Sequence, residues 1–227
     1  METDQTLTGR RLVRTDIEQL CRADQTATIE NCDLSDQDLA KLDLSRWQFT
    51  GCNLARASFN GATLDEASFT NCRASATTFI GASLSEAIIK DGDYSNVNLR
   101  GATLTSLNIS DCKMTGADFT DARTLDLQLK SVLLVLAIMP KVSFCKTHLE
   151  GVDFSEADLR GCDFRDATLD DCSLRDANLP ECLFQGADLR GADLGGVRLT
   201  DAQSYKGAII SKRQAADLLG QLGLRVL

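Results

Sequence analysis

The stretch Gly151-Val-Asp-Phe-Ser-Glu-Ala-Asp-Leu-Arg-Gly-Cys-Asp-Phe-Arg-Asp-Ala-Thr-Leu169 repeats one pattern every five residues. Each unit holds a small residue (Ala, Cys or Val), a polar residue, a Leu or Phe, and then two polar or glycine positions. A period of five is neither the 3.6 of an amphipathic helix nor the 2 of a half-buried strand. One large apolar residue per short unit is typical of a solenoid, whose stacked turns bury a shared core.

The same register continues through most of the chain. We call the Leu or Phe the central position and the residue two before it the small position. No residue is inserted between Ile29 and Leu199, and all nine phenylalanines occupy the central position. One large and one small inward residue per unit suits a narrow, close-packed interior. Ala74 and Thr124 underfill the central position, so we expect local voids or altered turns there.

The nine cysteines predict buried thiols rather than a disulfide framework. The chain has no CxxC pair and a single histidine, His148, which gives a zinc site little support. Cysteine at the small position replaces alanine as a small buried hydrophobe, and reduced thiols agree with a cytoplasmic protein. Seven cysteines occupy that position: Cys32, Cys52, Cys72, Cys112, Cys162, Cys172 and Cys182.

The N-terminal 28 residues depart from the register and are expected to cover the first coil. Leu7, Leu12 and Ile17 are five apart, so the repeat could begin early, but they are offset from the later units. Thr15-Asp-Ile-Glu18 is also a capping box that predicts a short helix. Both interpretations stay open for residues 1–28, and the repeat domain is placed at 29–201.

Residues 202–227 change character and predict a short helix with an apolar tail. Ser211-Lys-Arg-Gln214 is a capping box, and Gly223 is a natural stop. This segment either seals the last coil or forms a homodimer contact. The candidate dimer contacts are Leu218, Leu219, Leu222, Leu224 and Val226.

The stretch Arg123–Ser143 is the largest departure from the motif. Leu133, Val135, Leu136 and Ile138 are apolar where other units carry polar residues. The stretch is either a loop or an apolar face packed under a neighbouring segment, or it is an exposed patch for a protein partner.

No catalytic constellation is present in the sequence. His148 occupies an outward position, and GxSxG, GxxxxGK[ST] and HExxH motifs are absent. The rows of Asp do not follow the nonapeptide pattern of calcium-binding β-rolls. We therefore predict a non-enzymatic protein with no cofactor or metal. No apolar run reaches the roughly 18 residues of a membrane span, and no signal peptide is evident, so a cytoplasmic protein is expected.

The negative charge is concentrated in one part of the chain. The formal net charge is −9, and residues 146–201 alone hold thirteen acids against six bases. Such a surface is unsuited to direct nucleic-acid binding and suited to a basic groove on a protein, although solenoid surfaces also need charge for solubility. The candidate acidic face consists of Asp153, Glu156, Asp158, Asp163, Asp166, Asp171, Asp176, Asp188 and Asp193.

Units such as Ala187-Asp-Leu-Arg-Gly191 and Ala192-Asp-Leu-Gly-Gly196 resemble those of the pentapeptide-repeat proteins. The resemblance covers roughly Ile29–Leu199. It implies an all-β solenoid, a right-handed quadrilateral β-helix with twenty residues per coil and about nine coils, followed here by a short C-terminal α-helix.

The tail from Ile209 to Val226 resembles the closing helix of the Qnr/MfpA branch, where this segment mediates dimerisation. The stretch before Phe144 falls where Qnr-type proteins carry a projecting loop. The resemblance implies a homodimeric DNA mimic that binds DNA gyrase or topoisomerase IV and protects it from quinolones or related poisons. The alternative is an interaction scaffold or effector-like adaptor that uses the apolar patch around 133–138.

Overall fold

The chain forms an all-parallel β-solenoid of about eight turns with a short C-terminal helix, which confirms the predicted fold class. The computed structural model describes residues 5–22, 26–197, 202–220 and 223–225. The chain divides into two compact units, Met1–Leu133 and Leu134–Leu227, and each is described by itself.

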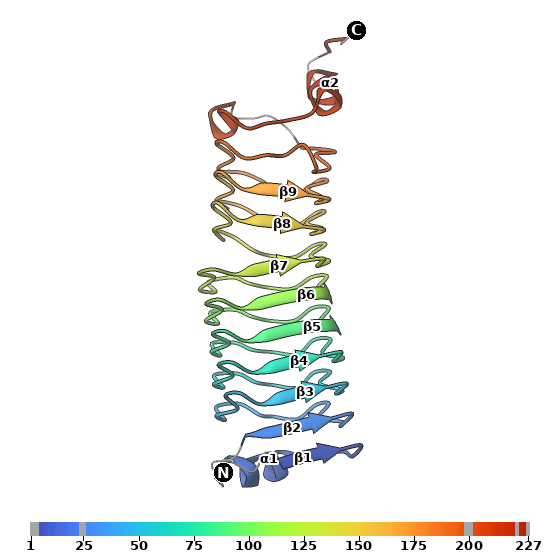
Figure 1. Cartoon of the computed structure of the whole chain (residues 1–227), viewed down its shortest axis with the longest axis vertical. Helices are drawn as coiled ribbons and strands as arrows, with labels where there is room; N and C mark the ends of the chain where they lie inside the picture. Colours follow the sequence, from blue (N-terminus) through green and yellow to red (C-terminus); the bar gives the residue numbers. More distant parts are fainter. Residues whose placement is uncertain (1–4, 23–25, 198–201, 221–222, 226–227) are drawn as a thin grey trace. The chain divides into compact units, whose positions relative to one another are not determined.

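The first unit stacks seven strands in chain order as one parallel sheet (Figure 1). From β2 onward each strand residue pairs with the residue twenty positions later, as Phe49 does with Phe69. Leu7 pairs with Ile29, a separation of 22 residues. The sheet therefore begins before Ile29, and the longer first turn explains the offset of Leu7 and Leu12. The strands are β1 (Gln5–Thr8), β2 (Ala27–Glu30), β3 (Gln48–Thr50), β4 (Ser68–Thr70), β5 (Ile88–Asp93), β6 (Asn108–Lys113) and β7 (Gln128–Lys130).

Helix α1 (Arg14–Arg22) occupies part of the longer first turn. Its cap differs from the prediction, because the Val13 N–H donates to Asp16 Oδ2 at 3.0 Å. Glu18 instead accepts a 2.6 Å hydrogen bond from Arg14 Nε. The capping box predicted at Thr15–Glu18 is therefore wrong, and the helix begins at Arg14, two residues earlier than Asp16, where that box would start it.

The second unit contains β8 (His148–Glu150), β9 (Thr168–Asp170), the 3-10 helix η1 (Ala202–Tyr205) and α2 (Lys212–Gly220). Leu149 pairs with Leu169, so the twenty-residue spacing also holds here. The bridge between Asp188 and Ile209 spans 21 residues and includes η1. The last coil therefore contains one extra residue, and the register has already shifted at Ser204, whose carbonyl accepts the Phe184 N–H.

The central residues form columns of buried side chains inside each unit. Phe49 and Phe69 stack with ring centroids 4.8 Å apart, and Phe164 and Phe184 stack at 5.0 Å. Tyr205 continues the second stack at 4.9 Å from Phe184. The predicted packing rule is thus confirmed, because a large residue repeats at the coil spacing and stacks upon its counterpart.

The thiols at the small position make a recurring hydrogen bond. Cys52 Sγ donates to the main-chain oxygen of Ile29 at 3.2 Å, and Cys162 Sγ donates to that of Met139 at 3.0 Å. Thr77 Oγ1 makes the same bond to Leu54 at 2.7 Å. Each acceptor lies 23 residues earlier in the chain, so the side chain donates to a main-chain carbonyl of the preceding coil. All nine cysteines are free, as predicted.

The two underfilled central positions behave differently. Ala74 is fully buried, and the next coil holds the fully buried Tyr94 at its central position. The Tyr94 ring fits only because residue 92 is glycine. A Cβ at Gly92 would lie 2.6 Å from Tyr94 Cε2. Thr124 is only half-buried, and the neighbouring Leu125 is 67% exposed.

The stretch Arg123–Ser143 keeps the repeat throughout. Residues with positive φ recur every five positions at Asp126, Ser131, Leu136 and Lys141. The central residues of this stretch, Leu129, Leu134 and Met139 among them, are buried. It is therefore part of the coil, and the loop-like alternative is wrong.

No helix in the described part of the chain has the length and hydrophobicity that a membrane span requires.

Candidate protein-binding surface

From Asn31 to Gly186 every five-residue unit ends in a corner. The residue two after the central position has a positive φ in each of these units, for example 57° at Glu156 and 55° at Asp176. The N–H of this corner residue donates to a carbonyl of the next coil, as from Glu156 to Arg175 at 2.9 Å and from Asp176 to Gly195 at 2.8 Å. Corner residues of successive coils therefore stack in columns within a unit.

The nine predicted acidic residues fall into two structural sets. One set immediately precedes the central residue, and we call its members the turn acids. The other set occupies corners, and we call its members the corner acids. The turn acids are Asp153, Asp158, Asp163, Asp188 and Asp193, and the corner acids are Glu156, Asp166, Asp171 and Asp176.

The turn acids have a structural role. Asp153 Oδ1 accepts the Ser155 N–H at 2.9 Å, and Asp163 Oδ1 accepts the Arg165 N–H at 3.0 Å. The Gly195 N–H donates to Asp193 Oδ1 at 2.9 Å in the same way. These are Asx turns, which explain why Asp and Asn recur before the central residue.

Four turn acids are also neutralised by arginine. The guanidinium groups of Arg160 and Arg165 each lie 2.7 Å from the carboxylate two residues earlier, Asp158 and Asp163. Their hydrogen bonds lower the pKa of both carboxyl groups. Asp188 is paired with Arg190 and Asp193 with Arg175. These carboxylates are ionised at neutral pH, but an arginine neutralises each of them. A binding partner would therefore meet ion pairs here rather than free negative charges.

The corner acids carry the uncompensated charge. All four are exposed, and none forms an ion pair within the described residues. Glu181 shares both properties and was missed in the sequence prediction. Its position two residues after the central Leu179 was the available signal. The corner acids and Glu181 are thus the carboxylates of this group that are exposed and have no ion pair among the described residues.

The only histidine of the sequence is paired with an aspartate at the surface. His148 lies on β8, and its Nε2 is 2.9 Å from Asp170 Oδ2 in an exposed pair. Within the described part of the chain, no group of three His, Cys, Asp or Glu side chains could hold a metal ion.

Helix α2 is fixed to the last coil by one polar side chain. The predicted capping box is confirmed: Ser211 N–H donates to Gln214 Oε1 at 2.6 Å, and Gln214 N–H donates to Ser211 Oγ at 3.2 Å. Gln214 Nε2 also donates to the carbonyls of Leu189 and Ala192 at 2.7 and 2.8 Å. Gln214 and Leu218 are buried, so this face of the helix covers the coil end.

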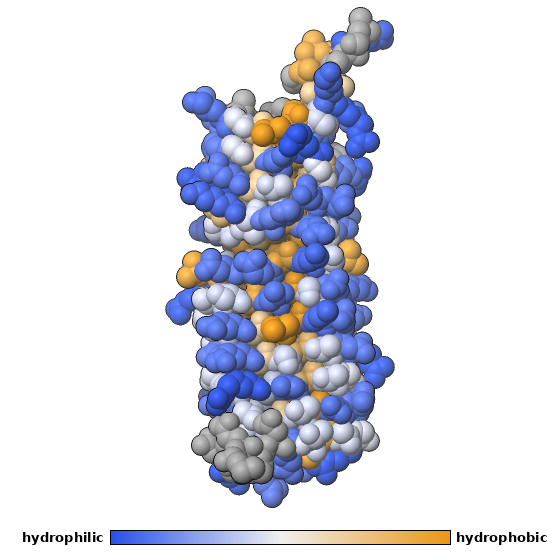
Figure 2. Space-filling view, in the orientation of Figure 1, coloured by the Kyte–Doolittle hydropathy of each residue, from blue (hydrophilic) through white to orange (hydrophobic). Residues whose placement is uncertain are grey.

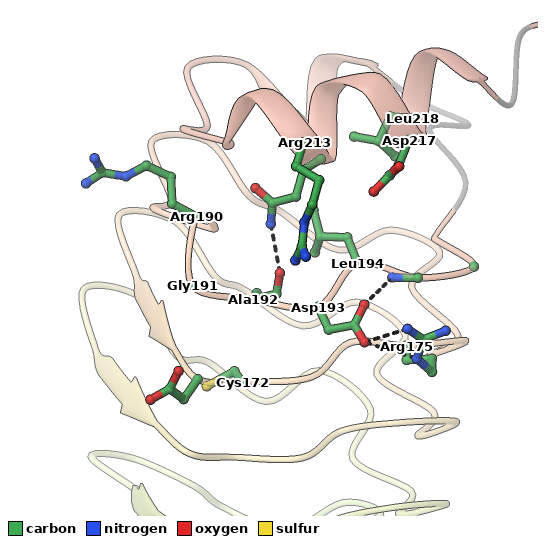
Figure 3. Close-up of a pocket in the computed structure, with 14 residues that line it drawn as sticks. Cys172, Arg175, Arg190, Gly191, Ala192, Asp193, Leu194, Arg213, Asp217 and Leu218 are labelled. Atoms are coloured by element: carbon green, nitrogen blue, oxygen red, sulfur yellow. Dashed lines mark hydrogen bonds and ion pairs between the residues drawn. The ribbon is translucent and has the colours of Figure 1, made fainter.

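A groove of about 630 Å³ lies between α2 and the last coils (Figure 3). Arg213, Asp217 and Leu218 come from the helix, and Arg175 and Asp193 come from the coils. Both signs of charge line it, and Arg175 is held by Asp193 at 2.7 Å. The groove therefore has no single charge preference.

The predicted dimer contacts differ in their exposure. Leu218 is buried within its own chain, whereas Leu219 and Leu224 are 38% and 55% exposed. Ile209 and Ile210 add further exposed apolar side chains before the helix. Leu222 and Val226 lie outside the described residues.

The predicted apolar patch faces outward. Leu133, the last residue of the first unit, is 46% exposed. In the second unit Leu136 and Ile138 are 54% and 40% exposed, and Val135 is half-buried. The exposed side chains of each unit are otherwise mainly hydrophilic on the face in Figure 2, so such apolar groups are exceptional.

The family comparison agrees with the repeat geometry. A model of the pentapeptide repeat region matches residues 25–92, and the pentapeptide repeats model of eight copies matches residues 90–121, 137–166 and 167–202. Together these matches cover more than half of the sequence. The chain belongs to the pentapeptide-repeat family.

Solved structures of this family share the fold. QnrB1, described as a plasmid-mediated fluoroquinolone resistance protein, is 23% identical with a TM-score of 0.68, and 99% of this chain aligns with 98% of that chain. Its full-length form gives a TM-score of 0.55 at 22% identity, covering 97% and 98% of the two chains. HetL from Nostoc sp. strain PCC 7120, described as involved in heterocyst differentiation regulation, is 23% identical with a TM-score of 0.66 over 82% and 86%. No curated protein sequence matches significantly. At these identities the similarity establishes the fold alone.

Proposed function

We propose that this protein is a non-enzymatic DNA mimic that binds DNA gyrase or topoisomerase IV and protects it from a quinolone or related poison. The observation that carries the proposal is the set of exposed corner acids in the second unit. Glu156 and Asp176 occupy the same corner of successive coils, about 4.8 Å apart, and Asp166 and Asp171 lie on two other corners of the same unit. A surface with this much exposed negative charge would be steered toward a groove that normally receives phosphates.

The C-terminal segment supports a homodimeric form of this mimic. Helix α2 uses Gln214 and Leu218 to cover its own coil end. Leu219, Leu224, Ile209 and Ile210 remain exposed, and a second copy of the chain would bury them. Dimerisation through this segment is part of the proposal.

The proposal is tested by adding the purified protein to gyrase supercoiling and DNA-cleavage reactions. We expect inhibition of supercoiling at high protein concentration, or fewer drug-stabilised DNA breaks with a fluoroquinolone. An absence of both effects at micromolar protein, for gyrase and for topoisomerase IV, would reject the proposal.

A second candidate is an interaction scaffold whose partner does not bind DNA. It is favoured by the exposed side chains of Leu133, Leu136 and Ile138, because an exposed apolar surface binds proteins without regard to charge. Replacing Leu133, Val135 and Leu136 with Ser should then abolish partner binding while leaving the fold intact.

A further inference from the structure

Leu136 is unusual among the corner residues. The other described residues with positive φ at corners are Gly, Asn, Asp, Glu, Lys, Arg, Ser and Ala. Leu136 has a φ of 60° and a side chain that is largely exposed. A large apolar residue is disfavoured in the left-handed region, where Gly and Asn are preferred.

The fold supplies no reason for leucine at this corner. The Leu136 N–H donates to the main-chain oxygen of Ser155 at 3.1 Å, and any non-proline residue could make this bond. The side chain is not part of the core, which is formed here by Leu134, Ala137 and Met139. Leu136 is therefore unfavourable for the backbone and contributes little to packing, which is typical of a residue kept for binding.

The neighbours of Leu136 define an edge with mixed chemistry. Glu156 and Asp176 occupy the same corner in the next two coils, and hydrogen bonds between successive coils hold this column together. Both acids are exposed and form no ion pair within the described residues. Ile138 adds a second exposed apolar group beside Leu136. We call Leu136, Ile138, Glu156 and Asp176 the Leu136 edge.

We propose that the Leu136 edge binds a basic protein segment that offers an apolar contact followed by two cationic side chains. This inference rests on the proposed function in taking the partner to have a basic surface. Coil spacing places the two carboxylates about 4.8 and 9.6 Å beyond the Leu136 corner. An α-helix laid along the edge presents residues i, i+3 and i+7 on one face, at rises of about 4.5 and 10.5 Å. Such a helix matches the edge in spacing and charge.

The two kinds of group on this edge have separable roles. Exposed carboxylates mainly accelerate association with a basic partner, and salt weakens that effect. Leu136 becomes desolvated in the complex and mainly slows dissociation. Nucleic acid and anionic membranes are repelled by Glu156 and Asp176, so the edge selects a basic protein.

The test measures binding kinetics of the full-length protein by surface plasmon resonance. Two probes are used: DNA gyrase, and a synthetic helical peptide with Leu at position i and Arg at i+3 and i+7. The variants are Leu136→Asn and the double variant Glu156→Gln/Asp176→Asn. The control is Ile88→Asn, which removes a 48% exposed apolar side chain from β5 in the first unit, where the paired residue of β6 is already Asn108.

We expect Leu136→Asn to weaken binding about tenfold, chiefly through faster dissociation, with an equal or higher melting temperature because Asn tolerates positive φ. The double variant should slow association and reduce its salt dependence, and Ile88→Asn should bind as the wild type does. A folding defect in Leu136→Asn would contradict the assignment of a binding role.

The outcomes separate this inference from the proposed function. If the wild type binds gyrase and Leu136→Asn binds equally well, the inference is overturned and the proposed function stands. If the wild type does not bind gyrase, the assays with topoisomerase IV decide the proposed function, and the peptide decides this inference. Peptide binding that Leu136→Asn weakens, and that a peptide with Glu in place of Arg lacks, supports the inference; equal binding or no binding rejects it.

Discussion

Gln214 Nε2 lies 2.8 Å from the main-chain oxygen of Ala192, and this bond joins the start of α2 to the last coil. The same nitrogen donates to Leu189, and the side-chain oxygen accepts the Ser211 N–H. One buried amide therefore caps the helix and attaches it to carbonyls that would otherwise lose their partners at the end of the solenoid.

Gln214→Glu separates these two tasks. Glutamate keeps an acceptor for the Ser211 N–H but replaces both donors with a carboxylate that faces two carbonyl oxygens. We expect detachment of α2, at a cost of about 2 kcal/mol, because buried polar groups lose their partners. Hydrogen exchange of the α2 amides measures this, with Gln48→Glu on the exposed side of β3 as control. Unchanged protection of α2 would show that Gln214 does not hold the helix.

Tyr94 provides a test of packing in the first unit. Its hydroxyl is buried and has no hydrogen-bond partner among the described residues, and burial raises its pKa well above the ordinary value. Tyr94→Phe should therefore leave stability unchanged or raise it by about 1 kcal/mol. Urea unfolding measures the change. A variant less stable by 1 kcal/mol or more would mean that the hydroxyl has a partner.

Gly92→Ala is the matching destabilising change. A Cβ at this position would lie 2.6 Å from Tyr94 Cε2 and 2.7 Å from the main-chain oxygen of Cys72. The ring or the coil must move, and overpacking of this kind costs about 1–3 kcal/mol. The Gly92→Ala/Tyr94→Leu double variant should recover part of the loss if the ring is the obstacle.

The turn acids predict the direction of acid sensitivity. Hydrogen bonds lower the folded-state pKa of Asp158, Asp163 and Asp188 below that of an unfolded chain, about 3.9. The unfolded state then binds more protons at low pH, so the stability from these groups is present above about pH 4 and is lost as the pH falls. Urea midpoints between pH 7 and 2.5 should fall accordingly. Asp163→Asn should flatten this dependence, and an identical slope would contradict the assignment.

The exposed leucines at the C-terminal end predict the dimer seam. Leu219→Asp should convert the dimer to a monomer in light scattering without loss of the fold, because Leu219 is exposed within its own chain. Leu218→Asp should instead destabilise α2, since Leu218 is buried against the coil end. Val13→Asp, which changes an exposed apolar residue near α1, serves as control. A Leu219→Asp protein with unchanged mass would exclude this surface as the seam.

Most of the fold could be read from the sequence because the five-residue period acts through packing alone. Each central Leu or Phe is buried by the equivalent residue of the next coil, so period and fold are directly linked. The longer first turn could not be read, since it depends on α1 fitting between Leu12 and Ala27. The capping of α1 by Asp16 was missed because Thr15-Asp-Ile-Glu18 offers an equally valid local pattern.

The candidate site was less accessible to sequence reasoning. Composition identified the acidic region, but it could not separate Asp158, held in a turn and paired with Arg160, from Asp176, exposed at a corner. That distinction requires the three-dimensional turn. Likewise the apolar run around Leu136 did not reveal whether the chain left the coil there.

The central claim is that the corner acids of the second unit mimic DNA phosphates toward a type II topoisomerase. The most direct measurement compares two variants with equal charge change in gyrase supercoiling and fluoroquinolone-induced cleavage assays. One carries Glu156→Gln, Asp166→Asn, Asp171→Asn and Asp176→Asn, and the other carries Asp158→Asn, Asp163→Asn, Asp188→Asn and Asp193→Asn. We predict that the wild type and the turn-acid variant act on gyrase, and that the corner-acid variant loses activity at least tenfold. Equal activity of the two variants, or no effect of the wild type on either gyrase or topoisomerase IV, would contradict the claim.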